Sequence, residues 1–166
     1  MFARFIMDRK VVAIILGVAL VLGAYLWMCV PHPESVNAPL TLSEAKARFS
    51  VLSSLPATAH DIYFARSSGG LGGGAHMLRF SAPIADCKAF VTAYCRPYLP
   101  AVQVADTWIP VSQPPQSPDL KAYRLAVEWF GVDRLQEGLL LSRPAETCPT
   151  VWIDTKAETL YSYWTD

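Results

Sequence analysis

The sequence has no net charge and no concentrated cluster of basic residues. Its 14 lysine and arginine residues are balanced by 14 aspartate and glutamate residues, and only 17% of the 166 residues are charged. Nucleic-acid binding needs a basic surface that neutralises phosphates. The composition therefore argues against a nucleic-acid partner.

The sequence also lacks the motifs of common active sites. The glycine-rich run from Ser67 to Gly74 has no lysine and precedes a strand-like pattern instead of a helix, so a phosphate-binding loop is not expected. His32, His60 and His76 lack the short spacing of zinc ligands, and no Gly-x-Ser-x-Gly elbow is present. We predict no catalytic residue, no metal and no cofactor, and the sequence does not support an enzyme.

One segment has no charge at all. Residues 11–30 contain twenty residues without a charged side chain. As an α-helix they measure about 30 Å, the thickness of the hydrocarbon core of a bilayer. A buried soluble helix is the alternative, but so small a domain can hardly cover a helix that is apolar on every side. We therefore predict a transmembrane helix at 11–30.

The flanking charges predict the orientation of this helix. Arg4, Arg9 and Lys10 precede it, and the first charged residue after it is Glu34. Positive residues stay on the cytoplasmic side of the inner membrane, so the rest of the chain is expected outside, in the periplasm. The resulting division is a cytoplasmic tail at 1–10, a linker at 31–40 and an extracytoplasmic domain at 41–166.

We expect the helix to remain attached as a signal-anchor. The small residues before Pro39 resemble a cleavage site, but proline directly after the cut generally blocks signal peptidase, and the apolar run exceeds the usual signal core. Ala13, Gly17 and Ala24 share one helical face and would let another helix approach closely. Membrane lipid and another protein are the expected partners.

The remaining pattern predicts an α+β domain, a small antiparallel sheet with one to three packed helices. Thr41 and Glu44 form a capping-box pattern that predicts a helix at 42–52, and an apolar stripe predicts a helix at 84–96. The prolines between 97 and 118 predict an irregular crossing, followed by a short helix through Trp129. Alternating segments predict strands at 60–66, 77–82, 139–142, 150–154 and 159–164.

The last two strands form a predicted hairpin. If Asp154 pairs with Thr159, Trp152 lies opposite Tyr161, with Tyr163 next along the same face. Left bare, Trp152, Tyr161 and Tyr163 are the candidate partner surface. In the alternative, the helix at 42–52 or the proline-rich segment covers them, because exposed apolar patches are rare on isolated domains.

Three cysteines fall in the external domain, where the compartment permits disulfides. Cys87 and Cys95 share a helix and lie about 12 Å apart, too far to bond each other. We expect a Cys95–Cys148 bond, with Cys87–Cys148 as the alternative. Cys87 lies on the apolar stripe and is otherwise a buried thiol.

Several short motifs occur together in the chain. They are Leu55-Pro56-Ala57-Thr58-Ala59, Leu78-Arg79-Phe80, Asp86-Cys87-x-x-Phe90, Trp129-Phe130, Trp152-Ile153-Asp154 and Tyr161-Ser162-Tyr163-Trp164. With them, residues 40–166 resemble uncharacterised bacterial membrane-anchored or lipoprotein domains. The resemblance implies an extracytoplasmic α+β fold and carries neither an activity nor a catalytic residue.

These features predict a single-pass, membrane-anchored binding or accessory protein that is a subunit of a larger membrane complex. Two alternatives stay open. One is a periplasmic inhibitor such as an immunity protein. The other is an envelope enzyme with an unrecognised site, centred on a free Cys87 or Cys95.

Overall fold

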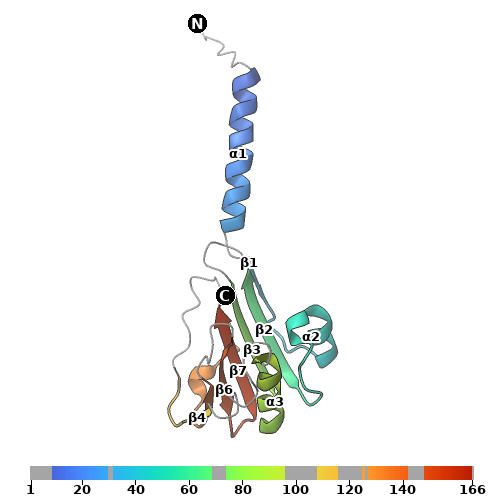
Figure 1. The fold of residues 1–166 in the computed structure, drawn as a ribbon, viewed down its shortest axis with the longest axis vertical. Coiled ribbons are helices and arrows are strands. Elements are labelled where there is room, and N and C mark those ends of the chain that lie inside the picture. Colours follow the sequence, from blue (N-terminus) through green and yellow to red (C-terminus); the bar gives the residue numbers. More distant parts are fainter. Residues whose placement is uncertain are drawn as a thin grey trace.

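The computed structural model describes residues 9–29, 32–68, 74–95, 108–115, 125, 127–141 and 148–165. Within these ranges the chain forms three α-helices and one seven-stranded antiparallel sheet, which confirms the α+β class (Figure 1). The helices are α1 (Arg9–Cys29), α2 (Leu42–Arg48) and α3 (Ile84–Cys95). The strands are β1 (His32–Ser35), β2 (His60–Ser68), β3 (Ala75–Ser81), β4 (Trp108–Val111), β5 (Gly138–Leu141), β6 (Thr150–Asp154) and β7 (Thr159–Thr165).

The sheet consists of a three-stranded part, β1 to β3, and a four-stranded part, β4 to β7, joined by the pairing of β3 with β7. The strand order is β1-β2-β3-β7-β6-β5-β4, and every neighbouring pair is antiparallel. Successive side chains of a strand point to opposite faces, so the apolar residues divide into two cores. One face buries Phe64, Phe80 and Leu160, and the other buries Met77 and Trp152.

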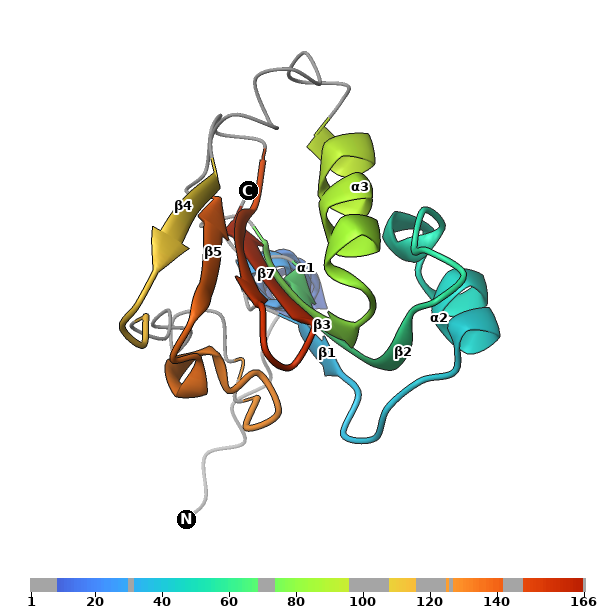
Figure 2. The ribbon, with the colours of Figure 1, turned by 90° about the horizontal axis from the view of Figure 1, so that it is seen from below.

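The first face is covered by α2 and α3. Figure 2 shows both helices on the same side of the sheet. Helix α3 follows the predicted helix closely, and it buries Cys87, Phe90, Val91 and Cys95. Phe90 packs edge-on against Phe80 of the sheet, with ring centroids 5.3 Å apart. The apolar stripe of this helix is therefore the contact that holds it to the sheet.

The capping box at the start of α2 is confirmed. The Glu44 backbone N–H donates to Thr41 Oγ1, and the Thr41 backbone N–H donates to the Glu44 carboxylate. The predicted helix at 42–52 is divided, however, because Phe49 adopts an extended backbone and the chain continues as the 3₁₀ turn η1 (Ser50–Leu52). This break lets the Phe49 ring, 2% exposed, lie 4.5 Å from the ring of Phe64.

Two segments differ from the sequence-based expectation. Residues 32–35, expected in the linker, form β1 and pair with β2. Residues 108–111, expected in an irregular crossing, form β4 at the opposite edge, where Pro110 is tolerated because an edge strand leaves one row of N–H groups unused. Most of the predicted helix ending at Trp129 lies outside the described residues, and its last two residues form a turn.

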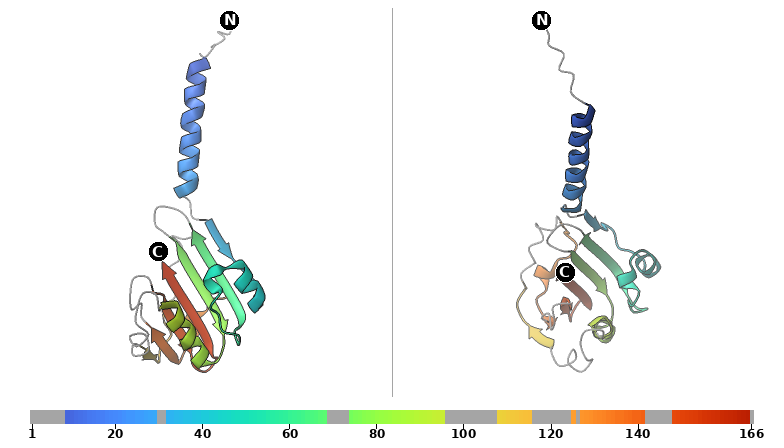
Figure 3. Two further views of the ribbon diagram at one scale, coloured as in Figure 1. Left: turned by 45° about the vertical axis from the view of Figure 1, so that its right-hand side comes forward. Right: turned by 45° about the horizontal axis from the view of Figure 1, so that its top comes forward.

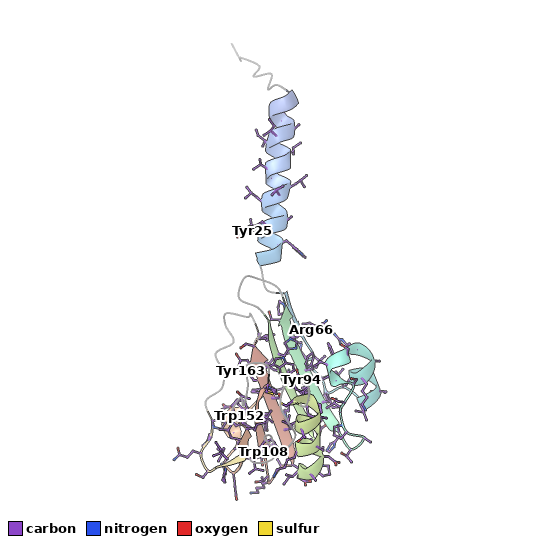
Figure 4. All side chains as sticks on the ribbon, viewed as in Figure 1. Tyr25, Arg66, Tyr94, Trp108, Trp152 and Tyr163 are labelled. Carbon is purple, nitrogen blue, oxygen red and sulfur yellow. The ribbon has the colours of Figure 1, made fainter. Side chains whose placement is uncertain are left out.

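Glu34 ties β1 to the domain. Its carboxylate accepts from Arg48 of α2 at 2.8 Å and pairs with Arg66 of β2 at 2.9 Å. The two guanidinium groups lie over the Phe49 ring, 5.0 and 5.6 Å from its centroid. The hydrogen bond from Arg48, joined by that from Arg66, holds the pKa of Glu34 below its ordinary value. Figure 4 places Arg66 at the end of the domain nearest to α1.

Helix α1 extends away from the domain, as both views of Figure 3 show. Tyr25 lies near its domain end (Figure 4). In the described part of the chain, no helix combines the length and the apolar character needed to cross a membrane. The assignment of residues 11–30 as a transmembrane helix therefore stays a prediction.

We expect Glu34→Gln to lower the free energy of unfolding by about 0.5–1 kcal/mol at pH 7, because both arginines lose an exposed ionic partner. The pKa of Glu34 is lowered on folding, so its contribution is present above pH 4.5 and is lost as the pH falls through the folded-state pKa. Urea unfolding at pH 7 and pH 3 measures this difference. If Glu34→Gln lowers the free energy of unfolding equally at pH 3 and pH 7, the ion pairs are not the cause. The same holds if the control variant Glu137→Gln gives an equal loss.

Candidate interaction surface

The predicted aromatic hairpin has the expected register but is not bare. Asp154 pairs with Thr159 and Trp152 with Tyr161. Trp152 and Tyr161 are each only 7% exposed, while Tyr163 is half-buried. The candidate surface of Trp152, Tyr161 and Tyr163 is therefore corrected, because its two central residues belong to the second core.

A segment that the sequence did not assign covers this hairpin. Phe130 packs edge-on against Trp152 and Tyr161, with centroids 6.5 and 5.8 Å apart. The chain then turns at Gly131, whose φ of 54° suits a residue without a side chain. Val132 and Leu135 follow as fully buried residues of the same core. The cover is thus not the helix at 42–52. The described part of the proline-rich stretch contributes Val111, which packs against the same core.

Beside the covered pair lies a cluster of four residues that we call the Arg79 cluster: Tyr63, Arg79, Trp129 and Tyr161. Register brings three of them together, since Tyr63 pairs with Arg79 and Arg79 with Tyr161 across β2, β3 and β7. The Arg79 guanidinium lies 5.5 Å from the Tyr63 ring centroid and 5.9 Å from that of Tyr161. Trp129 stacks on Tyr63 with centroids 5.4 Å apart.

The Arg79 cluster has hydrogen-bond donors without acceptors. Arg79 Nη1 donates to the Trp129 carbonyl at 2.8 Å, but Arg79 Nε and Trp129 Nε1 are buried and reach no acceptor in the described part of the chain. The ion pairs found among the described residues both involve Glu34, so no described carboxylate forms an ion pair with Arg79. A buried donor left unpaired costs about 1–3 kcal/mol.

The cluster has the composition of a binding hot spot. Tryptophan, tyrosine and arginine are the residues most enriched at the energetic centres of protein interfaces. Tyr63, Arg79 and Trp129 are each half-buried, so part of each side chain faces solvent. Burial raises the pKa of Tyr161, with Arg79 acting in the opposite direction, so its hydroxyl stays protonated at neutral pH.

The sequence alone did not single out Arg79 or Trp129. Arg79 alternates with Leu78 and Phe80 as a polar residue does on a solvent-facing strand. What distinguishes it is the face it shares with Met77 and Ala75, both fully buried. That second face is recognised as a core only because Leu125, Phe130, Val132 and Leu135 pack against it.

Cys87, Cys95 and Cys148 are buried free thiols in the structure. Cys87 Sγ donates to the Ala82 carbonyl at 3.3 Å, and burial, with a smaller effect of Asp86, raises the pKa of Cys87 to about 12. Burial, followed by the neighbouring Cys148 thiol, raises the pKa of Cys95 as well. A catalytic thiol needs a lowered pKa, so these environments do not favour the thiol version of an enzyme.

The small-residue face predicted on the N-terminal helix is exposed. Ala13, Gly17 and Ala24 are exposed on α1, and the space around Gly17 is open. A shallow depression at this point is lined by Ile14, Gly17, Val18, Val21 and Leu22. Among the described residues, no three histidine, cysteine or acidic side chains come together in a way that could hold a metal ion.

No protein-family model, no curated protein and no solved structure matches this chain. The resemblance drawn from short motifs stays an expectation.

We predict that Cys95 and Cys148 form a disulfide when the folded, detergent-solubilised protein is exposed to oxidised glutathione, since the two buried thiols are neighbours. Closing this loop is worth about 3–4 kcal/mol. Thiol titration after denaturation should count two free thiols of the four cysteines. Cys95→Ser should give three free thiols, and a count of four in the wild type contradicts the pairing.

We expect Phe130→Ala to lower the free energy of unfolding by about 3–4 kcal/mol, because it removes a ring that covers Trp152 and Tyr161. Tryptophan emission should also move to longer wavelength as water reaches Trp152. Phe130→Leu is the matched control and should lose less than half as much. Equal losses in the two variants would argue against a specific role of the ring.

Proposed function

We propose that the protein is a single-pass membrane protein whose extracytoplasmic domain acts as an accessory, partner-binding subunit of a larger membrane complex. The observation that carries the proposal is the environment of α1. Ten large apolar side chains of this helix are each at least 51% exposed: Ile14, Ile15, Leu16, Val18, Leu20, Val21, Leu22, Tyr25, Leu26 and Trp27. Their positions surround the helix, so no single protein surface would cover all of them.

The uncharged run of the sequence supports the same proposal. As an α-helix with a rise of 1.5 Å per residue, residues 11–30 measure about 30 Å. The side chains described in α1 cover only Val12 to Trp27, so the length argument rests on the sequence. In lipid, a helix of this kind satisfies its backbone hydrogen bonds internally, and its apolar side chains contact the lipid chains.

The orientation is part of the proposal. Arg4, Arg9 and Lys10 lie before the apolar run, and they favour a cytoplasmic N-terminus with the domain on the outer side. The domain then lies in an oxidising compartment, which suits the contact between Cys95 and Cys148. Tyr25 and Trp27, near the domain end of α1, match residues that prefer the membrane interface.

Binding is a better-supported role than catalysis. The described residues contain no metal-type cluster, and the pKa values of Cys87 and Cys95 are raised. The Arg79 cluster instead offers donors and aromatic surface. The exposed small-residue face of α1 favours a subunit of a complex over an inhibitor that acts only through its periplasmic domain, because close approach of a second helix needs small side chains.

The proposal is tested by fractionation and by co-purification. The chain should remain in the membrane after alkaline carbonate washing, and protease added to spheroplasts should digest the C-terminal domain. Purification in mild detergent from native membranes should recover a second membrane protein. A carbonate-soluble chain, or a lone monomer from native membranes, overturns the proposal.

A substitution in α1 tests the helix contact. We expect Gly17→Leu to reduce the recovered partner about tenfold, since loss of close packing between membrane helices costs on the order of 1–2 kcal/mol. In the free helix a Cβ at Gly17 meets nothing within 4 Å, so membrane insertion should be unchanged. Gly23→Leu is the matched control, because Gly23 is equally open but lies about 120° away around the helix. Equal recovery with both variants contradicts the predicted face.

A further inference from the structure

We propose that the Arg79 cluster binds a carboxylate group carried by an acidic segment of a partner polypeptide. This deepens the proposed function and rests on it, because it names the chemistry by which the domain recognises its partner. The cluster presents two buried N–H donors, Arg79 Nε and Trp129 Nε1, that reach no acceptor in the described part of the protein. Arg79 and Trp129 are half-buried as whole residues, so a partner that binds here meets side chains with unsatisfied donors.

The geometry of Arg79 favours a carboxylate over a neutral acceptor. Its Nη1 is already bonded to the Trp129 carbonyl, which leaves the edge formed by Nε and Nη2 without a described acceptor. Two parallel N–H groups on one planar edge match the two oxygens of a carboxylate. The rings of Tyr63 and Tyr161 on the guanidinium hold it in place and reduce its contact with water.

The charge of the surroundings supports the same conclusion. Arg48 and Arg66, on the other face of the sheet, share the carboxylate of Glu34, whereas no described carboxylate forms an ion pair with Arg79. Asp154 and Asp133 are close enough to act on Tyr161, but the effect of Arg79 on that residue is larger. Because Arg79 is half-buried and has no described ion-pair partner, its positive charge is available to a ligand. A single arginine does not provide the repeated positive charge that a nucleic-acid backbone requires.

The half-buried rings indicate a polypeptide as the source of the carboxylate. Tyr63 and Trp129 stack on each other beside Arg79 and leave part of their surface exposed. Such a rim offers apolar contact to the residues that flank an acidic side chain, whereas a small free anion would use only the guanidinium edge. Aromatic rims around a desolvated charge are typical of protein interfaces.

The experiment uses the full chain in detergent micelles, labelled with ¹⁵N. Two synthetic peptides are titrated, acetyl-Glu-Leu-Glu-Leu-Glu-amide and the matched peptide with glutamine in place of glutamate. Inorganic phosphate and acetate are titrated separately. The acidic peptide should shift the indole N–H signal of Trp129 and the Nε–H signal of Arg79 in a saturable manner, with at least tenfold higher affinity than the glutamine peptide.

Variants locate the effect. Arg79→Gln should abolish the saturable shift, and Arg79→Lys should weaken binding at least tenfold, because lysine keeps the charge but loses the planar edge. Lys46→Gln is the control, since Lys46 is an exposed cation on α2, across the sheet from the cluster. Circular dichroism and the Trp152 indole signal check that each variant is folded.

The outcomes separate this inference from the proposed function. Equal affinity for the two peptides, or unchanged binding by folded Arg79→Gln, overturns the carboxylate site. Equally strong binding of phosphate or acetate alone overturns the polypeptide source. If a partner co-purifies from membranes and Arg79→Gln retains it, the inference fails while the proposed function stands. If nothing co-purifies, the proposed function fails, and the peptide titration still decides whether the cluster binds carboxylates.

Discussion

The pairing of β3 with β7 is the contact on which the rest of the domain depends. These strands are separated by about eighty residues in the chain, and seven residue pairs join them. Without this ladder the N-terminal strands β1 to β3 and the C-terminal strands β4 to β7 would be two separate small sheets. Isolated small sheets are marginally stable in water, so the domain exists because this non-local pairing forms.

The same pairing creates both faces of the sheet. One row of paired residues contains Phe64, Leu78, Ser162 and Val151 on the face covered by α2 and α3. The neighbouring row contains Tyr63, Arg79, Tyr161 and Trp152 on the other face. The two covers are of different kinds. Capped and amphipathic helices cover the first face, whereas an irregular segment anchored by Phe130 covers the second.

This difference between the covers has a functional consequence. A helix satisfies its own backbone and packs along its whole length, so it closes the first face well. The irregular cover buries Trp152 and Tyr161 but leaves the neighbouring Tyr63, Arg79 and Trp129 half-buried. The Arg79 cluster therefore lies where the second face is incompletely closed. A partner held near by the proposed membrane anchor would meet this surface at high local concentration.

Local patterns were sufficient to predict most of the helices and strands. The capping box at Thr41, the stripe of α3 and the register of the last hairpin follow from residues close together in the chain, so the sequence by itself determined them. The apolar run at 11–30 and its proposed place in lipid are likewise a property of sequence. The edge strands β1 and β4 were not recognised, because short strands that contain proline carry little alternating signal.

Only the tertiary structure decided which surfaces are bare. Burial of Trp152 and Tyr161 depends on Phe130, twenty or more residues away in a segment without a regular period. The importance of Arg79 depends on three strands and a turn meeting around it. The local pattern predicts which side chains share a face. The residues that cover that face are distant in the chain, and so are the acceptors that a buried donor finds or lacks.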